Sequence, residues 1–454
     1  MKSKIIKVPD TKIPEWKTLN LASSRESVNV KTLRLLSGLV AADKISSRLR
    51  RLEDLYHHLL AHPETIAFAC KRNAVQILLV MKNSQRDKIT LELIGQLLAI
   101  FGYVDPPKSR GLRILSIDGG GMRGIAVIKM LEKIENLSGK KVYELFDFIC
   151  GVSTGAIIAC CLVPPHCMPL DKVHQLYRTM SSKVFNQSAF WGTSKLMWNH
   201  AYYDTAIWEN LLKDYVGNSV LIDTAKYSNC PKIAVISTIV NHSKVAPYIF
   251  RNYGNPYNRS SEYHGGFQHS MFEAIRASAA APTIFEEFRT GNILHQDGGI
   301  IVNNPTAVAL HEAKLLWPNE HISCIVSCGT GRYDPLPMTD QLRNLKEGST
   351  SWKSMLDKIL ESATDTESIH TLISDILPEG VYFRLNPHLS GMVSMDDIND
   401  ERISRLEEDT NMYCRRNEEK FVEISKILVT KRSVFQQTYD KLLYHTKLFK
   451  SKIN

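Results

Sequence analysis

The spacing of apolar residues divides the chain into two parts of different character. Between residues 31 and 101, apolar side chains such as Ile45 and Leu49 recur at helical intervals, with arginines between them. This spacing gathers the apolar side chains on one face, which predicts amphipathic helices. The stretch DPPKSRG, residues 105–111, interrupts the pattern and predicts a linker. We therefore expect a basic, all-helical N-terminal region over residues 1–104.

From Leu112 onward, short apolar runs alternate with helical stretches. The runs LRILSID, FDFIC, KIAVIST and SCIVSC have the length and the β-branched content of buried strands. Strands that alternate with helices predict an α/β domain with a largely parallel central sheet, which we place over residues 112–333. Residues 334–454 become charged and helical in pattern towards the end. There we expect a mostly helical C-terminal region that packs on the α/β domain.

The stretch GVSTG lies where a predicted strand gives way to a helix. It follows FDFIC and precedes AIIACCL, so Ser153 would sit on a sharp strand-to-helix turn. The flanking glycines would let the strand and the helix pass closely, and the helix N-terminus would stabilise negative charge near the serine oxygen. An ordinary glycine-flanked turn has the same pattern. The candidate nucleophile motif comprises Gly151, Val152, Ser153, Thr154 and Gly155.

A second glycine-rich stretch, SIDGGGMRG, ends the first predicted strand of the α/β domain. Its glycines satisfy G-x-G-x-x-G, but the next strand does not end in the acidic residue that a dinucleotide site requires. No Gly-Lys-Ser/Thr follows, as a P-loop would need. The remaining interpretation is a cluster of backbone amides at a helix N-terminus, which binds an anion and lies at the same sheet edge as Ser153. This loop comprises Gly119, Gly120, Gly121, Met122, Arg123 and Gly124.

A candidate base follows in the stretch HQDGGIIVNNP. Asp297 ends a predicted strand there and is followed by Gly298 and Gly299. Aspartate before two glycines is common in turns. Asp297 is nevertheless the third polar residue beside glycines at a strand end of the same predicted sheet. This favours the interpretation that Asp297 is a general base that accepts the Ser153 proton.

In this order, DGGGMRG, GVSTG and DGG resemble the motifs of the patatin-like phospholipase family, and RASAAAP, NNP and SCGTGR also match it. LFDFICGVSTGAIIA, MWNHAYYD and ATDTE are similar to its calcium-independent phospholipases A2 of the gamma type. The resemblance implies a three-layer patatin-like fold and a Ser-Asp dyad without histidine. Ser153 would be the nucleophile, Asp297 the base, and the backbone of residues 119–124 the oxyanion hole.

The resemblance also implies a reaction and a place in the cell. Such enzymes hydrolyse fatty acyl esters of glycerophospholipids, through an acyl-enzyme, to a lysophospholipid and a free fatty acid. We expect a peripheral enzyme on intracellular phospholipid membranes, at mitochondria, peroxisomes or the endoplasmic reticulum. The C-terminal residues 451–454 read SKIN and give no peroxisomal Ser-Lys-Leu.

Three alternatives stay open at this point. A Ser-His-Asp esterase with an α/β-hydrolase fold would use His311 or His321 after Asp297. A non-catalytic lipid-binding protein would keep the fold without the reaction. A neutral-lipid lipase or a transacylase of the same family would share the dyad.

Charge and composition add expectations about partners. The net charge of +9 arises from residues 1–110, which hold 19 Lys and Arg against 10 Asp and Glu, whereas the remainder holds 37 of each. This excess suits an anionic membrane surface or a solvated helix face; we expect no nucleic acid partner. Nine cysteines without a C-x-x-C pair predict free thiols in a reducing compartment and no zinc site. We expect no cofactor, no calcium loop and no transmembrane helix.

Overall fold

The computed structural model describes residues 15–186, 203–333 and 366–449, and the side chains of 15–24, 445 and 447–449 are outside that description. The stretch MWNHAYYD and most of ATDTE therefore lie largely outside it. The chain divides into two compact units, residues 1–97 with 447–454 and residues 98–446. Among the described helices, none has the length and hydropathy that a membrane span requires.

The first unit is helical, as the apolar spacing predicted. In its second helix Leu52, Leu55 and Leu59 are buried, whereas Ile45 at the first position is 57% exposed. The buried hydroxyl of Thr32 hydrogen-bonds His58 Nε2 at 2.8 Å and links the first two helices. The helices are α1 (Glu15–Val40), α2 (Ile45–Ala61), α3 (Ile66–Lys71), α4 (Ala74–Ser84) and α5 (Lys88–Ile100), the last of which contains the boundary between the units.

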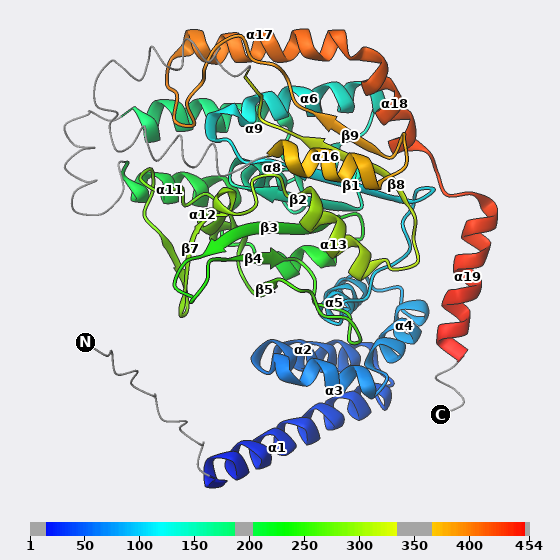
Figure 1. The fold of residues 1–454 in the computed structure, drawn as a ribbon. Helices are drawn as coiled ribbons and strands as arrows, with labels where there is room; N and C mark the ends of the chain where they lie inside the picture. The colour runs from blue at the N-terminus through cyan, green and yellow to red at the C-terminus, as the bar shows by residue number, and fades with distance from the viewer. Residues whose placement is uncertain (1–14, 187–202, 334–365, 450–454) are drawn as a thin grey trace, which may run out of the picture. The chain divides into compact units, whose positions relative to one another are not determined.

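The second unit is built on one mixed, mostly parallel sheet with the strand order β5-β4-β3-β2-β1-β8-β9 (Figure 1). β1 pairs in parallel with β2 and β8, and β2 pairs in parallel with β3. β4 and β7 both run antiparallel to β3, and β6 pairs with β7. The strands are β1 (Leu112–Ile117), β2 (Phe148–Val152), β3 (Lys232–Ile239), β4 (Ala246–Arg251), β5 (His264–Gly266), β6 (Phe288–Thr290), β7 (Ile293–Asp297), β8 (Ile322–Cys328) and β9 (Tyr382–Leu385).

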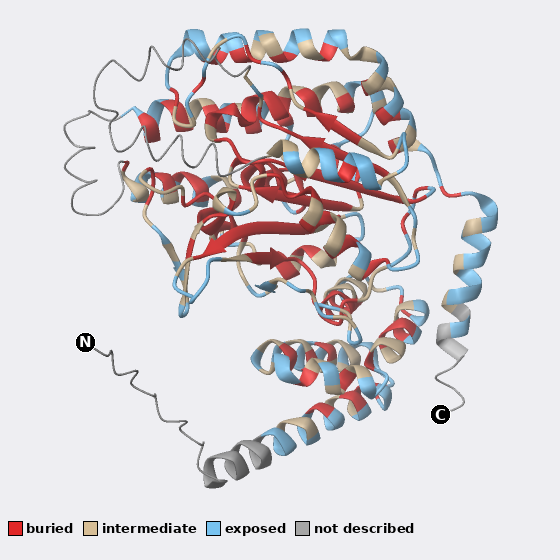
Figure 2. Cartoon of the chain, in the orientation of Figure 1, coloured by how far each residue is buried: buried red, intermediate tan, exposed pale blue. Residues whose placement is uncertain are grey.

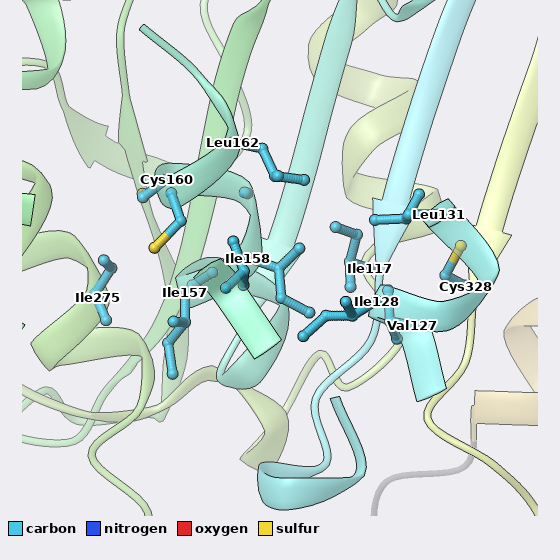
Figure 3. Packing of buried hydrophobic residues seen from close by; sticks show 14 of the residues in the cluster. Ile117, Val127, Ile128, Leu131, Ile157, Ile158, Cys160, Leu162, Ile275 and Cys328 are labelled. Atoms are coloured by element: carbon cyan, nitrogen blue, oxygen red, sulfur yellow. The ribbon is translucent and has the colours of Figure 1, made fainter. Parts of the chain in front are cut away.

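Helices cover both faces of this sheet, so every residue of β1 and β2 is buried (Figure 2). Strands buried on two faces read as continuous apolar runs, which is why these two were recognisable. On one face Ile117 packs with Val127 and Ile128 of α6 and Ile158 of α8 (Figure 3). On the other face α13 packs on β1 and β2. The three helices that cover the sheet here are α6 (Gly124–Ser138), α8 (Thr154–Leu162) and α13 (Thr306–Leu316).

Residues beyond 333 are part of the same unit. β9 extends the sheet next to β8. The sequence analysis expected a mostly helical region there and did not identify this strand, because four residues are too short a run to recognise. α17 and α18 pack on the outer side of α6. The expected linker, residues 105–111, also lies within this unit, where Trp317 Nε1 donates to the Asp105 carbonyl at 2.9 Å. The other helices are α7 (Val142–Leu145), α9 (Leu170–Thr179), α11 (Thr205–Val216), α12 (Met271–Ser278), α16 (Thr366–Ile376), α17 (Asp400–Arg416), α18 (Glu418–Val429) and α19 (Val434–Phe449).

Candidate active site

Ser153 lies at the turn between β2 and α8 in a strained backbone conformation. Its φ of 53° and ψ of −118° are values that a residue with a side chain rarely adopts, and such strain concentrates at functional sites. A Cβ at Gly155 would lie 2.3 Å from the Ile117 carbonyl oxygen, and one at Gly151 would lie 2.3 Å from that of Gly155. Both positions therefore exclude a side chain, so that the half-buried serine can project from the turn.

The neighbours of Ser153 in the motif are buried. Val152 ends β2, and the Thr154 hydroxyl hydrogen-bonds Tyr177 of α9. The Ser153 amide donates to Ser278 Oγ at 2.8 Å, and Ser278 Oγ donates to the Ile236 carbonyl at 2.5 Å. Ser278 thus ties the turn to β3. The sequence analysis missed this role, because nothing in the stretch RASAAAP singles out Ser278.

Asp297 is brought to Ser153 by the pairing of both with β3. Val152 is the register partner of Ile236, and Asp297 is the partner of the next residue, Ser237. Because β2 runs parallel and β7 antiparallel to β3, these two strands meet end to end along one edge of it. Ser153 Oγ donates a hydrogen bond of 2.6 Å to Asp297 Oδ2. A nucleophile and its candidate base are therefore in direct contact.

The surroundings of Asp297 favour a carboxylate that can take a proton near neutral pH. The residue is 7% exposed, and burial raises its pKa to about 6, although hydrogen bonds from Ser153 and the Gly299 amide lower it. The Gly299 amide donates to Oδ1 at 2.7 Å. A Cβ at Gly298 would lie 2.2 Å from the Ile236 carbonyl oxygen, so this glycine is needed for the close approach to β3. A base works best when its pKa lies near the operating pH.

The glycine loop adjoins the serine turn, and a Cβ at Gly119 would lie 3.3 Å from that of Ser153. Four of the six amides of the loop already donate hydrogen bonds to other backbone groups of the protein. The amides of Gly119 and Met122 donate to the carbonyls of Asn303 and Met395. Those of Arg123 and Gly124 donate back into the loop. Within the described ranges, the amides of Gly120 and Gly121 have no acceptor, so these two are the candidates for binding an oxyanion.

The loop is held in place by Arg384 of β9 and by Thr330, which follows β8. Asp118 is 1% exposed, and its Oδ2 accepts a hydrogen bond of 2.7 Å from Arg384. Burial raises the pKa of Asp118 to about 6, and the guanidinium opposes that shift. Thr330 donates to the Gly119 carbonyl at 2.8 Å. Arg123 is also buried, with its Nε 3.4 Å from the Gly120 carbonyl oxygen.

Comparison with known proteins agrees with this arrangement. Residues 115–310 match the family described as patatin-like phospholipase, and this range contains the serine turn, the glycine loop and Asp297. The chain carries a patatin-like phospholipase domain. The resemblance drawn from the three motifs and the expected fold are therefore confirmed.

Individual relatives extend the similarity beyond the patatin-like domain. Calcium-independent phospholipase A2-gamma of Homo sapiens is 42% identical over 94% of this chain and 54% of its own length. Phospholipase A I of Arabidopsis thaliana is 33% identical over 61% of this chain and 25% of its own. The chain spans about half the length of the gamma-type relatives it matches. Among solved structures, VipD from Legionella pneumophila is 14% identical with a TM-score of 0.36, over 70% of this chain and 67% of VipD.

The histidines of the patatin-like domain do not complete a triad. His295 is fully buried, and its two ring nitrogens hydrogen-bond Ser237 and Thr290 at 2.9 and 2.6 Å. Burial lowers the His295 pKa to about 4. His311 hydrogen-bonds the Glu262 amide, and His321 precedes β8 at the end of the sheet opposite to Ser153. In the described parts of the chain, no histidine hydrogen-bonds Ser153 or Asp297, and no group of three metal-ligating side chains occurs.

Proposed function

We propose that this protein is a calcium-independent phospholipase that hydrolyses fatty acyl esters of glycerophospholipids with a Ser153–Asp297 dyad. The observation that carries the proposal is the 2.6 Å hydrogen bond from Ser153 Oγ to Asp297 Oδ2, next to the Gly120 and Gly121 amides. The names of the gamma-type relatives support the substrate class and the independence from calcium.

The reaction follows from these positions. Asp297 accepts the Ser153 proton as Oγ attacks the carbonyl carbon of the ester. The carbonyl electron pair moves to oxygen, and the amides of Gly120 and Gly121 donate to it; one such donor contributes about 3 kcal/mol. When the intermediate collapses, the leaving alkoxide takes the proton from Asp297 and departs as the lysophospholipid. Water then attacks the acyl-enzyme with Asp297 as base, releases the fatty acid and returns the proton to Ser153.

Product analysis tests this proposal. The full chain is incubated with phosphatidylcholine vesicles, with and without a calcium chelator, and products are identified by mass spectrometry. We expect equal amounts of lysophosphatidylcholine and fatty acid, unaffected by chelator, and no product from Ser153→Ala. Acyl transfer to an acceptor lipid, or cleavage of triacylglycerol alone, would favour the transacylase or the neutral-lipid lipase instead.

A further inference from the structure

A cavity of about 400 Å³ lies between α17 and the glycine loop. Arg123 and Met395 line it on the side of the loop. The Met395 carbonyl accepts the Met122 amide at 2.8 Å, and a Cβ at Gly121 would lie 2.2 Å from that carbonyl oxygen. Met395, which lines the cavity, therefore lies directly beside Gly121, whose amide is one of the two assigned to the oxyanion.

Charged side chains of both signs line this cavity, and several of them are engaged with neighbours. Arg402 pairs with Asp397 at 3.2 Å. Asp396 accepts hydrogen bonds from Ser394 and from Tyr203. Arg123 contacts the Gly120 carbonyl. Of the remaining lining charges, Arg405 has no hydrogen-bond or ion-pair partner among the described residues, and Asp409 has one carboxylate oxygen, Oδ1, without such a partner.

Arg405 and Asp409 stand four residues apart on α17, and Cβ atoms at that spacing lie about 5–6 Å apart, so that opposite charges there can pair. Over the described part of the chain they form no ion pair with each other. Asp409 Oδ2 instead accepts the amide and the hydroxyl of Ser390, both at 2.8 Å, and the Arg405 guanidinium lies against Gly391. The loop thus holds a positive and a negative charge apart on one cavity wall.

We propose that this cavity is the headgroup subsite for a zwitterionic glycerophospholipid, with Arg405 facing the phosphate and Asp409 facing the ammonium group. The assignment rests on the function proposed above: in a glycerophospholipid the phosphate is only a few bonds from the acyl ester that Gly120 and Gly121 would bind, and Met395 beside Gly121 also lines the cavity. Phosphocholine and phosphoethanolamine carry the two charges in this way, joined by a two-carbon arm. Arg405 and Asp409 lie outside the matched patatin-like residues 115–310, so the two charges are a feature of the C-terminal region.

Substrate ratios test the two charges separately. Rates are measured in neutral mixed micelles on phosphatidylcholine, on phosphatidylglycerol, which lacks the ammonium, and on a soluble butyrate ester without a headgroup. Asp409→Asn should lower the kcat/KM ratio of phosphatidylcholine to phosphatidylglycerol about fivefold, as expected for one partly exposed charge pair. Arg405→Gln should lower the ratio of either phospholipid to the butyrate ester by a similar factor, and Arg405→Lys should recover part of it.

Two variants on the same helix provide matched controls. Glu408→Gln and Arg415→Gln remove the same charges from exposed positions outside the cavity, and they should leave all ratios unchanged. If the cavity variants and their controls give equal ratios, the proposal is wrong. A loss that is equal on the butyrate ester and on both phospholipids would also overturn it, because it would indicate a structural role.

A competition experiment separates this proposal from the proposed function. Glycerophosphocholine and inorganic phosphate are tested as inhibitors of butyrate ester hydrolysis. We expect glycerophosphocholine to inhibit the wild-type protein and to inhibit Arg405→Gln and Asp409→Asn about fivefold more weakly. Equal inhibition of these three proteins, no inhibition, or inhibition by inorganic phosphate at the same concentration would contradict a zwitterion subsite. If the wild-type protein cleaves the butyrate ester but no phospholipid, the proposed function fails, while this competition still decides what the cavity binds.

Discussion

The serine turn and the glycine loop lie side by side, but different parts of the chain hold them in place. The turn depends on its own glycines and on one hydrogen bond to Ser278. The loop depends on contacts from distant residues: Met395 takes one of its amides, and Arg384, 266 residues away, holds Asp118. The difference shows that local sequence can position a nucleophile. Which loop amides remain free to bind an oxyanion depends instead on the hydrogen bonds that distant residues make with the loop.

The largest effect should come from the dyad that Ser153 of the serine turn forms with Asp297 at the end of β7. Ser153→Ala and Asp297→Asn should each lower kcat on phosphatidylcholine by about a thousandfold or more, because each removes the same proton transfer. Residues that act as a unit are not additive, so the double variant should be little worse than either single one. Steady-state kinetics of the three proteins, with circular dichroism as the folding control, measure this.

Histidine variants sharpen the same prediction. His295→Ala, His311→Ala and His321→Ala should keep most activity if they fold. Thermal unfolding is the control, because His295 is buried and hydrogen-bonded at both ring nitrogens. If one folded histidine variant were as inactive as Ser153→Ala, the site would have to be interpreted as a triad and not as a dyad.

The second largest effect should come from crowding the glycine loop. Gly121→Ala would place its Cβ 2.2 Å from the Met395 carbonyl oxygen, so the loop must move and an oxyanion donor is displaced. We expect kcat to fall about a hundredfold with little change in KM. Gly139→Ala is the matched control: its φ of 67° is as unfavourable as the 57° of Gly121, but nothing lies within 4 Å. An equal loss of kcat in both variants would show that backbone strain alone, and not displacement of an oxyanion donor, causes the effect.

Protonation of Asp297 should give the next largest effect. Its pKa is about 6, and only the carboxylate can accept the Ser153 proton, so kcat should fall about tenfold per pH unit below 6. The raised pKa also means that the ionised group destabilises the fold as pH rises through 6, by roughly 2–3 kcal/mol. Asp297→Asn should therefore unfold at a higher temperature than the wild type at pH 8, with the difference vanishing below pH 4. A pH-independent kcat between 5 and 8 would contradict Asp297 as the base.

The sequence singled out Ser153 and Asp297, which the structure places in contact, but it did not single out individual amides of the glycine loop. The serine turn and Asp297 could be located because glycines must appear wherever backbones pass closely. The sequence could not show that the amides of Gly120 and Gly121 stay free in the described structure. The residues that accept other amides of the loop, Met395 and Asn303, lie far away in sequence. β9 was missed for a related reason: a short strand is defined by pairing with β8 and not by its own pattern.

A smaller effect should come from the hydrogen bond that fixes the serine turn. Ser278→Ala removes the acceptor of the Ser153 amide and the donor to Ile236, so two buried backbone groups lose their partner. We expect a loss of about 1–3 kcal/mol in unfolding free energy and about tenfold in kcat. Ser425→Ala is the matched control, because the Ser425 hydroxyl is buried without a hydrogen-bond partner in the described structure. If both variants lose the same unfolding free energy and the same kcat, the Ser278 hydroxyl contributes only packing and not the hydrogen bonds.

The smallest effect on catalysis should come from the basic N-terminal unit, which contrasts with the neutral remainder of the chain. We propose that this charge helps the protein bind anionic bilayers; a basic residue at such a surface contributes about 1 kcal/mol and is screened by salt. Replacing the exposed Lys31, Arg34 and Arg50 by glutamine should weaken binding to phosphatidylserine vesicles at least about fivefold at low salt. Rates in neutral micelles should stay unchanged.

The control removes the same charge from the exposed face of the C-terminal helices. Glutamine in place of Arg415, Arg416 and Lys426 leaves the N-terminal charge intact. Sedimentation with vesicles at low and high salt compares the two triple variants, and only the N-terminal one should lose its salt dependence. An equal loss in both would show that total charge, and not the N-terminal unit, governs binding. An equal loss on zwitterionic vesicles would mean that the three N-terminal residues serve the fold of their own unit.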